Sequence, residues 1–286
     1  MPEIAIAGAG PVALALGRAL TERGTLVACV ASRNPEHAEQ AARFIGGGAR
    51  ALAYAAIPEH ATHVLIAVSD RGIAPVAASL AGVPGRLQVA LHTCGSYGPE
   101  LLAPLASAGV ACGGLHPLQT LRDGAQGAAA LPGSAFAVCG DALALAWAEA
   151  IVATLSGRVL HIAPDARQLY HAAAVMASNY LAVVLDCAEQ LMRLAGVPPA
   201  DALGALAPLA RTSLENALRD GPAAALTGPV VRGDAATVAA HLAVLEGSGM
   251  ADLYKAAGVY ALRLARARGL RHAEAARVEQ ALLGGR

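Results

Sequence analysis

The amino-acid sequence predicts an α/β domain with a doubly wound, mostly parallel sheet, followed by an all-α domain. In the first half of the chain, short runs rich in Val, Ile, Leu and Ala alternate with helical stretches, and beyond residue 163 the pattern is helical. Continuous apolar runs between amphipathic helices are typical of strands buried on both faces of a parallel sheet. With 286 residues, the chain is also long enough to build two hydrophobic cores. We therefore expect one domain over residues 1–163 and a second over residues 164–286.

Apolar runs mark the predicted strands, and the segments between them are the predicted helices. The strands are expected at residues 3–7, 25–31, 63–68, 87–92, 110–115, 135–139 and 158–162. In the second domain, clusters of Gly and Pro predict helix ends near residues 196–199, 221–222, 228–229 and 247–249. The most apolar helical stretch, residues 172–185, contains Ser178 and Asn179, and we expect it to be too short to span a membrane.

The composition argues against several classes of partner. Lys and Arg number 21, as do Asp and Glu, so the formal net charge is zero and no basic run is present to attract a nucleic acid or an anionic membrane. The five cysteines are odd in number and far apart, which suits reduced thiols better than disulfides or a zinc site. The nine histidines form no compact ligand motif, and no signal-peptide pattern precedes the first strand. We therefore expect a cytoplasmic protein that binds no metal.

A glycine-rich turn follows the first predicted strand. The segment Gly8-Ala9-Gly10-Pro11-Val12-Ala13 matches G-x-G-x-x-A, and a helical stretch continues to about residue 23. The first glycine of this motif permits a tight turn, the second lets the backbone approach a pyrophosphate, and the small third residue lets the helix pack on the strand. The helix N-terminus then faces the phosphates, with the amides of Val12 and Ala13 as donors because Pro11 has no N–H. This pattern predicts a dinucleotide-binding Rossmann domain.

The end of the second predicted strand indicates which dinucleotide is bound. Folds specific for NAD commonly place an acidic residue at this point, against the ribose 2′-hydroxyl. This chain has Ser32 and Arg33 instead, and both can form hydrogen bonds with a 2′-phosphate. We therefore predict NADP as the cofactor in preference to NAD. The alternative is that Arg33 is a solvated residue at the start of the next helix.

Polar segments also follow the later strands, at the edge where ligands bind in such sheets. The sequence 114–118 reads Gly-x-His-Pro-Leu with His116 at its centre, and a later helical stretch carries Tyr170-His171 and Ser178-Asn179. The segment Leu226-Thr227-Gly228-Pro229 leads through two valines to Arg232. Further contacts with the cofactor are expected from Val68, Ser69, Asp70, His92, Thr93 and Ser96.

The order of these motifs resembles a family of bacterial Rossmann-like proteins that pair a nucleotide-binding domain with a helical C-terminal domain of unknown function. The layout is also similar to ketopantoate reductase, pyrroline-5-carboxylate reductase, 6-phosphogluconate dehydrogenase and prephenate dehydrogenase. Residues 114–118 look like the Gly-x-His-Pro-Met element of prephenate dehydrogenases, whose histidine accepts the substrate hydroxyl proton, so the resemblance implies this role for His116. Ser178-Asn179 resembles their Ser-His pair, but Asn179 replaces the second histidine, which argues against prephenate as the substrate.

These residues define a candidate active site. Hydride transfer between a nicotinamide and a carbonyl or imine needs a protein group that gives or takes a proton and others that orient the substrate. Because histidine titrates near neutral pH, His116 is the predicted proton donor or acceptor. On one helix, His171 and Ser178 project within about 20° of each other and Asn179 about 80° round, so we expect these three to orient substrate. Arg232 is expected to bind a substrate carboxylate or to contact another subunit. Hydrogen-bonded structural histidines and a solvated arginine are the alternatives.

The sequence thus predicts an NADP-dependent dehydrogenase or reductase that acts on a small carbonyl, imine or hydroxyacid in a cleft between its two domains. A non-catalytic NADP-responsive binding protein and a structural assembly protein are the alternatives, since a fold does not establish catalysis. The apolar, Ala- and Leu-rich helices beyond residue 163 and the dimers formed by the similar proteins predict a homodimer through the C-terminal helices.

Overall fold

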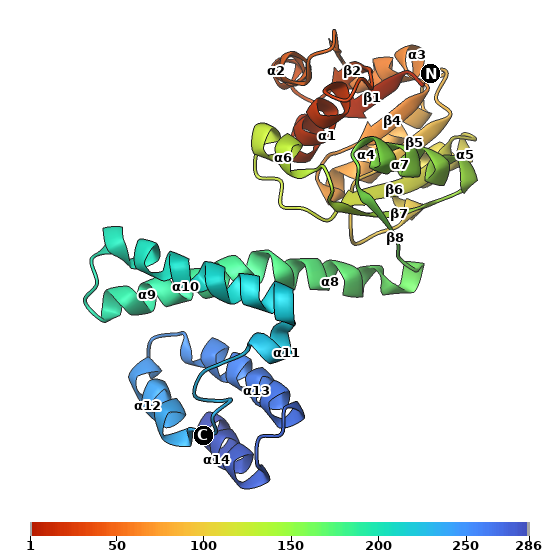
Figure 1. Cartoon of the computed structure of the whole chain (residues 1–286). Coiled ribbons are helices and arrows are strands. Elements are labelled where there is room, and N and C mark those ends of the chain that lie inside the picture. Colours follow the sequence, from red (N-terminus) through yellow and green to blue (C-terminus); the bar gives the residue numbers. More distant parts are fainter. Residues whose placement is uncertain (1, 285–286) are drawn as a thin grey trace. The chain divides into compact units, whose positions relative to one another are not determined.

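The computed structural model describes residues 2–284 and divides the chain into two compact units (Figure 1). The first unit ends at Tyr180 and contains the sheet, and the second begins at Leu181 and consists of helices and their connections. The predicted fold class, a doubly wound α/β domain followed by an all-α domain, is confirmed. The sequence placed a boundary at residue 163, and the division by compactness groups helix α8 (Arg167–Ala177) with the sheet.

The sheet has eight strands in the order β3-β2-β1-β4-β5-β6-β7-β8 (Figure 1). Neighbouring strands run parallel except for β6 and β7, which are antiparallel. The strands are β1 (Ile4–Ala7), β2 (Val27–Ala31), β3 (Arg50–Leu52), β4 (His63–Ile66), β5 (Val89–His92), β6 (Ala111–Pro117), β7 (Ala135–Gly140) and β8 (Arg158–His161). Successive strands run outward in opposite directions from β1 and β4, so this pair marks the switch point at which α/β sheets bind ligands.

Helices cover both faces of the sheet and bury one apolar core against each. Leu16 of α1 and Trp147 of α7 belong to the first core, and Ile73 of α4 and Leu105 of α5 belong to the second. Each such side chain stabilises the fold by about 1.5 to 3 kcal/mol when it is fully buried. The helical elements of this unit are α1 (Pro11–Thr21), α2 (Pro35–Ile45), η1 (Tyr54–Ala56), α3 (Ile57–His60), α4 (Asp70–Ala81), η2 (Pro99–Leu102), α5 (Ala103–Ser107), α6 (Gly124–Ala130), α7 (Ala142–Thr154), η3 (Pro164–Ala166) and α8.

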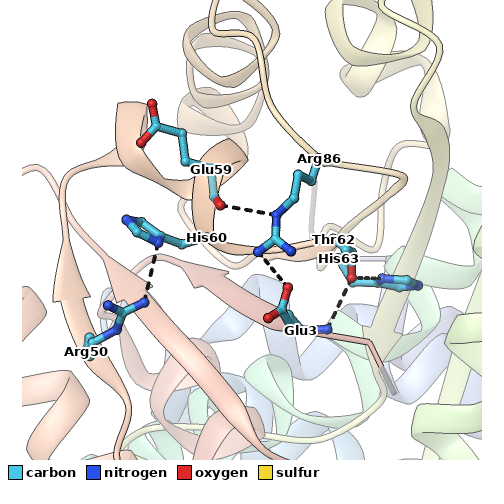
Figure 2. Close-up of polar contacts among 7 residues, drawn as sticks. All are labelled: Glu3, Arg50, Glu59, His60, Thr62, His63 and Arg86. Atoms are coloured by element: carbon cyan, nitrogen blue, oxygen red, sulfur yellow. Dashed lines mark hydrogen bonds and ion pairs between the residues drawn. The ribbon is translucent and has the colours of Figure 1, made fainter.

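A polar network joins the loops at the amino-terminal edge of the sheet (Figure 2). The guanidinium of Arg86 pairs with Glu3 at 2.6 Å and donates to the carbonyl oxygen of Glu59 at 3.2 Å. The backbone amide of Glu3 donates to Thr62 Oγ1 at 3.1 Å. Because the Arg86 and Glu3 side chains are about half exposed, their ion pair adds little to stability, on the order of 0 to 1 kcal/mol. The network orders the edge that lies opposite the predicted ligand site.

The second unit has its own small core. Val238, Leu262, Val278 and Leu282 are buried together where α12, α13 and α14 meet. None of the residues of α9, by contrast, is buried against the part of the chain that the structure describes. The helices are α9 (Asn179–Leu194), α10 (Pro199–Asp220), α11 (Pro222–Ala225), α12 (Ala235–Leu245), α13 (Ala251–Ala267) and α14 (His272–Leu283). Their ends fall near the predicted Gly and Pro clusters.

The helix through Ser178 is longer than the sequence predicted. Helical backbone runs from Pro164 to Leu194, which is 31 residues, and its most apolar 18-residue window has a mean hydropathy of 1.3 with no part buried. The expectation that this stretch is too short to cross a membrane was therefore wrong, because Ser178 (φ −119°, ψ −68°) marks a local break between α8 and α9 rather than an end. By length and composition alone the helix could span a bilayer. Its first turns, however, contact the sheet domain through Arg167 and Tyr170.

Candidate functional site

A cavity of about 720 Å³ lies at the carboxyl ends of β1, β2 and β4. Its volume falls within the range of about 300 to 1,000 Å³ that is common for small-molecule and cofactor sites. Eight of the predicted cofactor contacts line it: Gly8, Gly10, Pro11, Val12, Ser32, Arg33, Val68 and Ser69. Ala13, in the first turn of α1, is fully buried in the core, as the small third residue of the motif implies.

The two glycines of the turn serve different needs. Gly8 has φ +138°, and a Cβ at this position would stand 2.1 Å from the carbonyl oxygen of Ala67, so a side chain is excluded by the fold itself. A Cβ on Gly10 would meet nothing within 4 Å. Gly10 instead caps the N-terminus of α1, where the first amides lack intrahelical partners and favour an anion. The open cradle at Gly10 fits the pyrophosphate of a dinucleotide.

Three side chains with polar groups that the sequence did not predict also line the cavity: His37, Tyr54 and Arg71. His37 lies in the first turn of α2, and Arg71 lies in the first turn of α4. Tyr54 follows β3, a short edge strand that was not predicted. Burial raises the pKa of Tyr54, and the nearby Arg33 guanidinium opposes that rise. With Arg33 and Arg71 on its walls, the cavity suits an anionic ligand such as a nucleotide phosphate.

Replacing each glycine by alanine should separate folding from binding. Gly8→Ala should lower the melting temperature, because both the positive φ and the contact with Ala67 oppose a side chain. Gly10→Ala should leave the melting temperature almost unchanged and weaken NADP binding at least tenfold, since its methyl group would fill the space of the pyrophosphate. Thermal unfolding and calorimetric titration measure the two effects. Undiminished NADP affinity in the Gly10→Ala variant would contradict the assignment of Gly10 to the pyrophosphate site.

A second group of polar residues surrounds His116 near the carboxyl end of β6. Its Nδ1 lies 2.8 Å from Tyr170 Oη, and the two rings meet edge to face with centroids 5.6 Å apart. The His171 ring is 5.9 Å from that of His116. Gly95 of the loop after β5 faces both histidines, because a Cβ there would stand 2.9 Å from His116 Nε2 and 2.9 Å from His171 Nδ1. The structure thus brings together His116 and His171 and adds Tyr170, which the sequence analysis gave no role.

The environment of this group keeps the His116 ring neutral. Burial, and then the neighbouring His171, lower the pKa of His116 to about 4. Arg167 and His92 act in the same direction, and Asp70 opposes them. Tyr170 also stays neutral, since burial raises its pKa to about 12 against a smaller opposing effect of Arg167. At neutral pH the hydrogen bond therefore joins an uncharged imidazole to an uncharged phenol.

His92 differs from His116 in that both of its ring nitrogens are engaged. It is fully buried, Nδ1 accepts a hydrogen bond from the Cys94 amide at 3.1 Å, and Nε2 lies 2.7 Å from the Gly98 carbonyl oxygen. The protein fixes the tautomer of His92, which organises the loop that follows β5. Of the other predicted cofactor contacts in this loop, Thr93 bonds through its amide to β4, and the Ser96 carbonyl accepts from Gln168 at 3.0 Å.

Arg167 is a buried cation beside this loop. Only 3% of it is exposed, and Nη1 donates to the carbonyl oxygen of Tyr97 at 3.2 Å. Its other terminal nitrogen, Nη2, has no hydrogen-bond partner among the described residues, and the same holds for His171 Nδ1. A buried cation without a counter-charge costs several kcal/mol, so such a residue needs an explanation.

The remaining predicted residues lie elsewhere. Ser178 and Asn179 are exposed at the junction of α8 and α9. Arg232 belongs to the second unit, where it lines a cavity of about 280 Å³ together with Arg268 and Arg271. Within the described residues, no group of three or more His, Cys, Asp or Glu side chains is arranged to hold a metal ion.

Comparison with known protein families finds a match in each half of the chain. Residues 3–89 match the family described as NADP oxidoreductase coenzyme F420-dependent, and residues 134–261 match a domain of unknown function, DUF2520. The chain is thus similar to an NADP oxidoreductase domain in its first part and to DUF2520 in its second. The predicted resemblance is confirmed, and the predicted enzyme class and its cofactor NADP agree with the family of the first domain. No curated protein matches this chain in sequence.

Solved structures share the fold over nearly the whole chain. A Bacteroides fragilis protein described as an NADP oxidoreductase is 24% identical, with a TM-score of 0.75 over 91% of this chain and 97% of its own. A Thermotoga maritima protein is 23% identical, with a TM-score of 0.73 over 93% and 99%. Pyrroline carboxylate reductase of Plasmodium falciparum, solved with NADP bound, is 11% identical, with a TM-score of 0.61 over 94% and 98%. At these identities the likeness establishes the fold of this chain and leaves its substrate open.

The lowered pKa of His116 predicts a pH-dependent stability. As pH falls from 6.5 towards 4, the unfolded chain takes up a proton that the folded chain does not, so stability present above pH 6.5 is lost. The full loss from this residue is ~3 kcal/mol. His116→Gln should therefore lose less stability between pH 7 and pH 4.5 in urea titrations. The same pH dependence in both proteins would show that His116 is not the group responsible.

Proposed function

We propose that this chain is an NADP-dependent dehydrogenase or reductase of a small carbonyl, imine or hydroxyacid, with His116 as the group that gives or takes the substrate proton. The carrying observation is the convergence of His116, Tyr170 and His171 near the carboxyl end of β6. The dinucleotide cavity lies on the same edge of the same sheet, two strands away at β4. A dinucleotide held along the Gly10 cradle would extend along this edge.

Each part of the arrangement has a separate task. The bound nicotinamide supplies or accepts the hydride. The amides at the start of α1 hold the pyrophosphate, and Ser32 and Arg33 hold the 2′-phosphate. His116 exchanges a proton with the substrate oxygen or nitrogen through Nε2, and His171 orients the substrate. The idea that the helical domain completes the substrate site, through Ser178, Asn179 and Arg232, stays a prediction from the sequence.

The contrast between His92 and His116 favours an enzyme over a binding protein. His92, which orders its loop, engages both ring nitrogens. His116 uses Nδ1 alone, and Nε2 makes no hydrogen bond with the described residues. The His171 ring lies beside that of His116, and the charge of Arg167 also acts on His116. These features have no evident use in a protein that only responds to NADP.

Loss of the Arg33 charge should weaken NADP selectively. We expect Arg33→Gln to weaken the binding of NADP by on the order of 1 to 3 kcal/mol. The affinity for NAD, which lacks the 2′-phosphate, should not change. Arg43→Gln, in the last turn of α2 and outside the cavity, is the control. Titration calorimetry with both dinucleotides gives the comparison, and equal losses for NADP and NAD would contradict the role of Arg33.

His116→Gln should separate chemistry from cofactor binding. Turnover should fall by about 10² to 10⁴ and NADP affinity should persist, because the variant loses a proton-transfer group outside the cavity. The assay follows NADPH absorbance with a panel of small carbonyls and imines, and NADP with hydroxyacids. His241→Gln is the control, since His241 also bonds to a tyrosine, Tyr254, but lies in the second unit. If His116→Gln turned over as fast as the parent, the assignment would be lost.

We also propose a homodimer that forms through the C-terminal helices. On α9 large apolar side chains are exposed, including Leu181, Val183 and Val184. Apolar faces of this kind are commonly covered across a two-fold axis. Val184→Arg should convert the dimer to a monomer in light scattering, and Leu143→Arg on α7, where the leucine is also exposed, should not. A monomeric parent protein at micromolar concentration would refute the proposal.

A cytoplasmic location stays a prediction.

A further inference from the structure

The hydrogen bond between His116 and Tyr170 raises the question of which group donates. A phenol is a stronger acid than the N–H of a neutral imidazole, and an imidazole nitrogen is a stronger acceptor than a phenol oxygen. Both groups are uncharged at neutral pH, because burial lowers the pKa of His116 to about 4 and raises that of Tyr170 to about 12. Tyr170 Oη–H therefore donates to Nδ1, and the ring proton of His116 resides on Nε2.

This tautomer restricts what His116 can do alone. With Nε2 protonated and an imidazolium rarely formed at neutral pH, the ring cannot act as an ordinary acid. If a neutral imidazole gave up its only ring proton, it would become an imidazolate, which is strongly unfavourable in a buried site. The ring can pass a proton on only if Nδ1 gains one at the same time. The one group that bonds to Nδ1 within the described residues is Tyr170.

Arg167 supplies the charge that such an exchange requires. It precedes Tyr170 by three residues on α8, so their side chains lie on the same face of the helix. Its guanidinium is buried, with Nη2 unpartnered among the described residues, and it acts on Tyr170 in the direction that favours the phenolate. The charged or titratable groups that face His116 are Arg167 and His171 of α8, His92 of β5 and Asp70 of α4.

We propose that Arg167, Tyr170 and His116 form a proton relay that ends at the substrate oxygen. The inference rests on the proposed function, in which His116 Nε2 faces the reacting atoms. If a bound reduced nicotinamide supplied hydride to a carbonyl carbon, the π-electron pair would pass to the carbonyl oxygen, which would take the proton from Nε2. Nδ1 takes the proton of the Tyr170 hydroxyl, and Tyr170 is left as a phenolate beside Arg167 until water reprotonates it. Oxidation of a hydroxyl follows the same path in reverse.

The relay assigns a role to each of these residues. His116 is catalytic because it touches the reacting oxygen. Tyr170 and Arg167 are positioning residues, since they act through His116. The buried guanidinium of Arg167, whose Nη2 has no hydrogen-bond partner among the described residues, then stabilises a negative charge that forms only during the reaction.

The tautomer can be measured without any substrate. The full chain, labelled with ¹⁵N-histidine and studied with and without NADP⁺, gives long-range ¹H–¹⁵N spectra in which the shifts of Nδ1 and Nε2 distinguish the two tautomers. His116→Gln identifies the resonances of His116. We expect the Nε2–H form from pH 6 to pH 9, and a mixture of tautomers in Tyr170→Phe. A parent protein in the Nδ1–H form, or identical His116 shifts with and without the Tyr170 hydroxyl, would overturn the relay.

The chain contains a matched control for this substitution. Tyr254 Oη lies 2.8 Å from His241 Nδ1, with ring centroids 5.8 Å apart, nearly the same geometry as the pair at β6. Tyr254→Phe should change the shifts of His241 and leave those of His116 unaltered. Changes at His116 in both variants would indicate a general structural disturbance and count against the relay.

Arg167 is tested through the hydroxyl of Tyr170, which provides a second measurement if Tyr170→Phe folds poorly. With ¹³Cζ-tyrosine at pH 8, Arg167→Gln should shift the ¹³Cζ resonance of Tyr170, and Arg167→Lys should restore most of the parent shift. An unchanged Tyr170 resonance in Arg167→Gln would show that Arg167 does not act on this hydroxyl and would overturn its place in the relay. These spectra need no turnover, so they test the relay independently of the proposed function. The NADPH assay tests the oxidoreductase activity separately.

Discussion

The close approach of Gly8 to the carbonyl oxygen of Ala67 is the contact on which the first unit depends. It joins the ends of β1 and β4 at the point where the strand order changes direction, and no side chain fits between them. Because the strands are buried on both faces, polar chemistry is confined to the strand ends. The dinucleotide cavity and the His116 cluster therefore share one edge of the sheet, while the pairing of Arg86 with Glu3 orders the other.

Local patterns were sufficient to predict most of this architecture. The seven predicted strands are present because each is a continuous apolar run between turn signals, whereas β3 was missed because its three residues lie at an exposed edge without such a run. The length of the α8–α9 helix was misjudged for a related reason. Ser178 and Asn179 resemble a helix end in sequence, but the backbone continues through them with a local break.

The site was less predictable than the fold, because its partners come from distant elements. The motif around His116 pointed to the correct strand end, and Tyr170 was visible beside His171, but no local signal shows that its hydroxyl reaches Nδ1 across 54 positions. The roles of His92 and Arg167 likewise follow from burial, which sequence does not reveal. His116 lies between the two regions that match known families, and Tyr170 lies inside the second. The proposed relay therefore joins a residue outside both matched regions to residues inside the second.

The exposure of α9 affects how fast the protein is degraded in a cell. This helix has 16 residues, none of which is buried within the described chain, so packing stabilises it little. If a second copy covers it, mass action makes the order of α9 depend on how much protein is present. At concentrations too low for a dimer, proteases would then reach this segment first, so that degradation removes uncovered monomers before assembled ones.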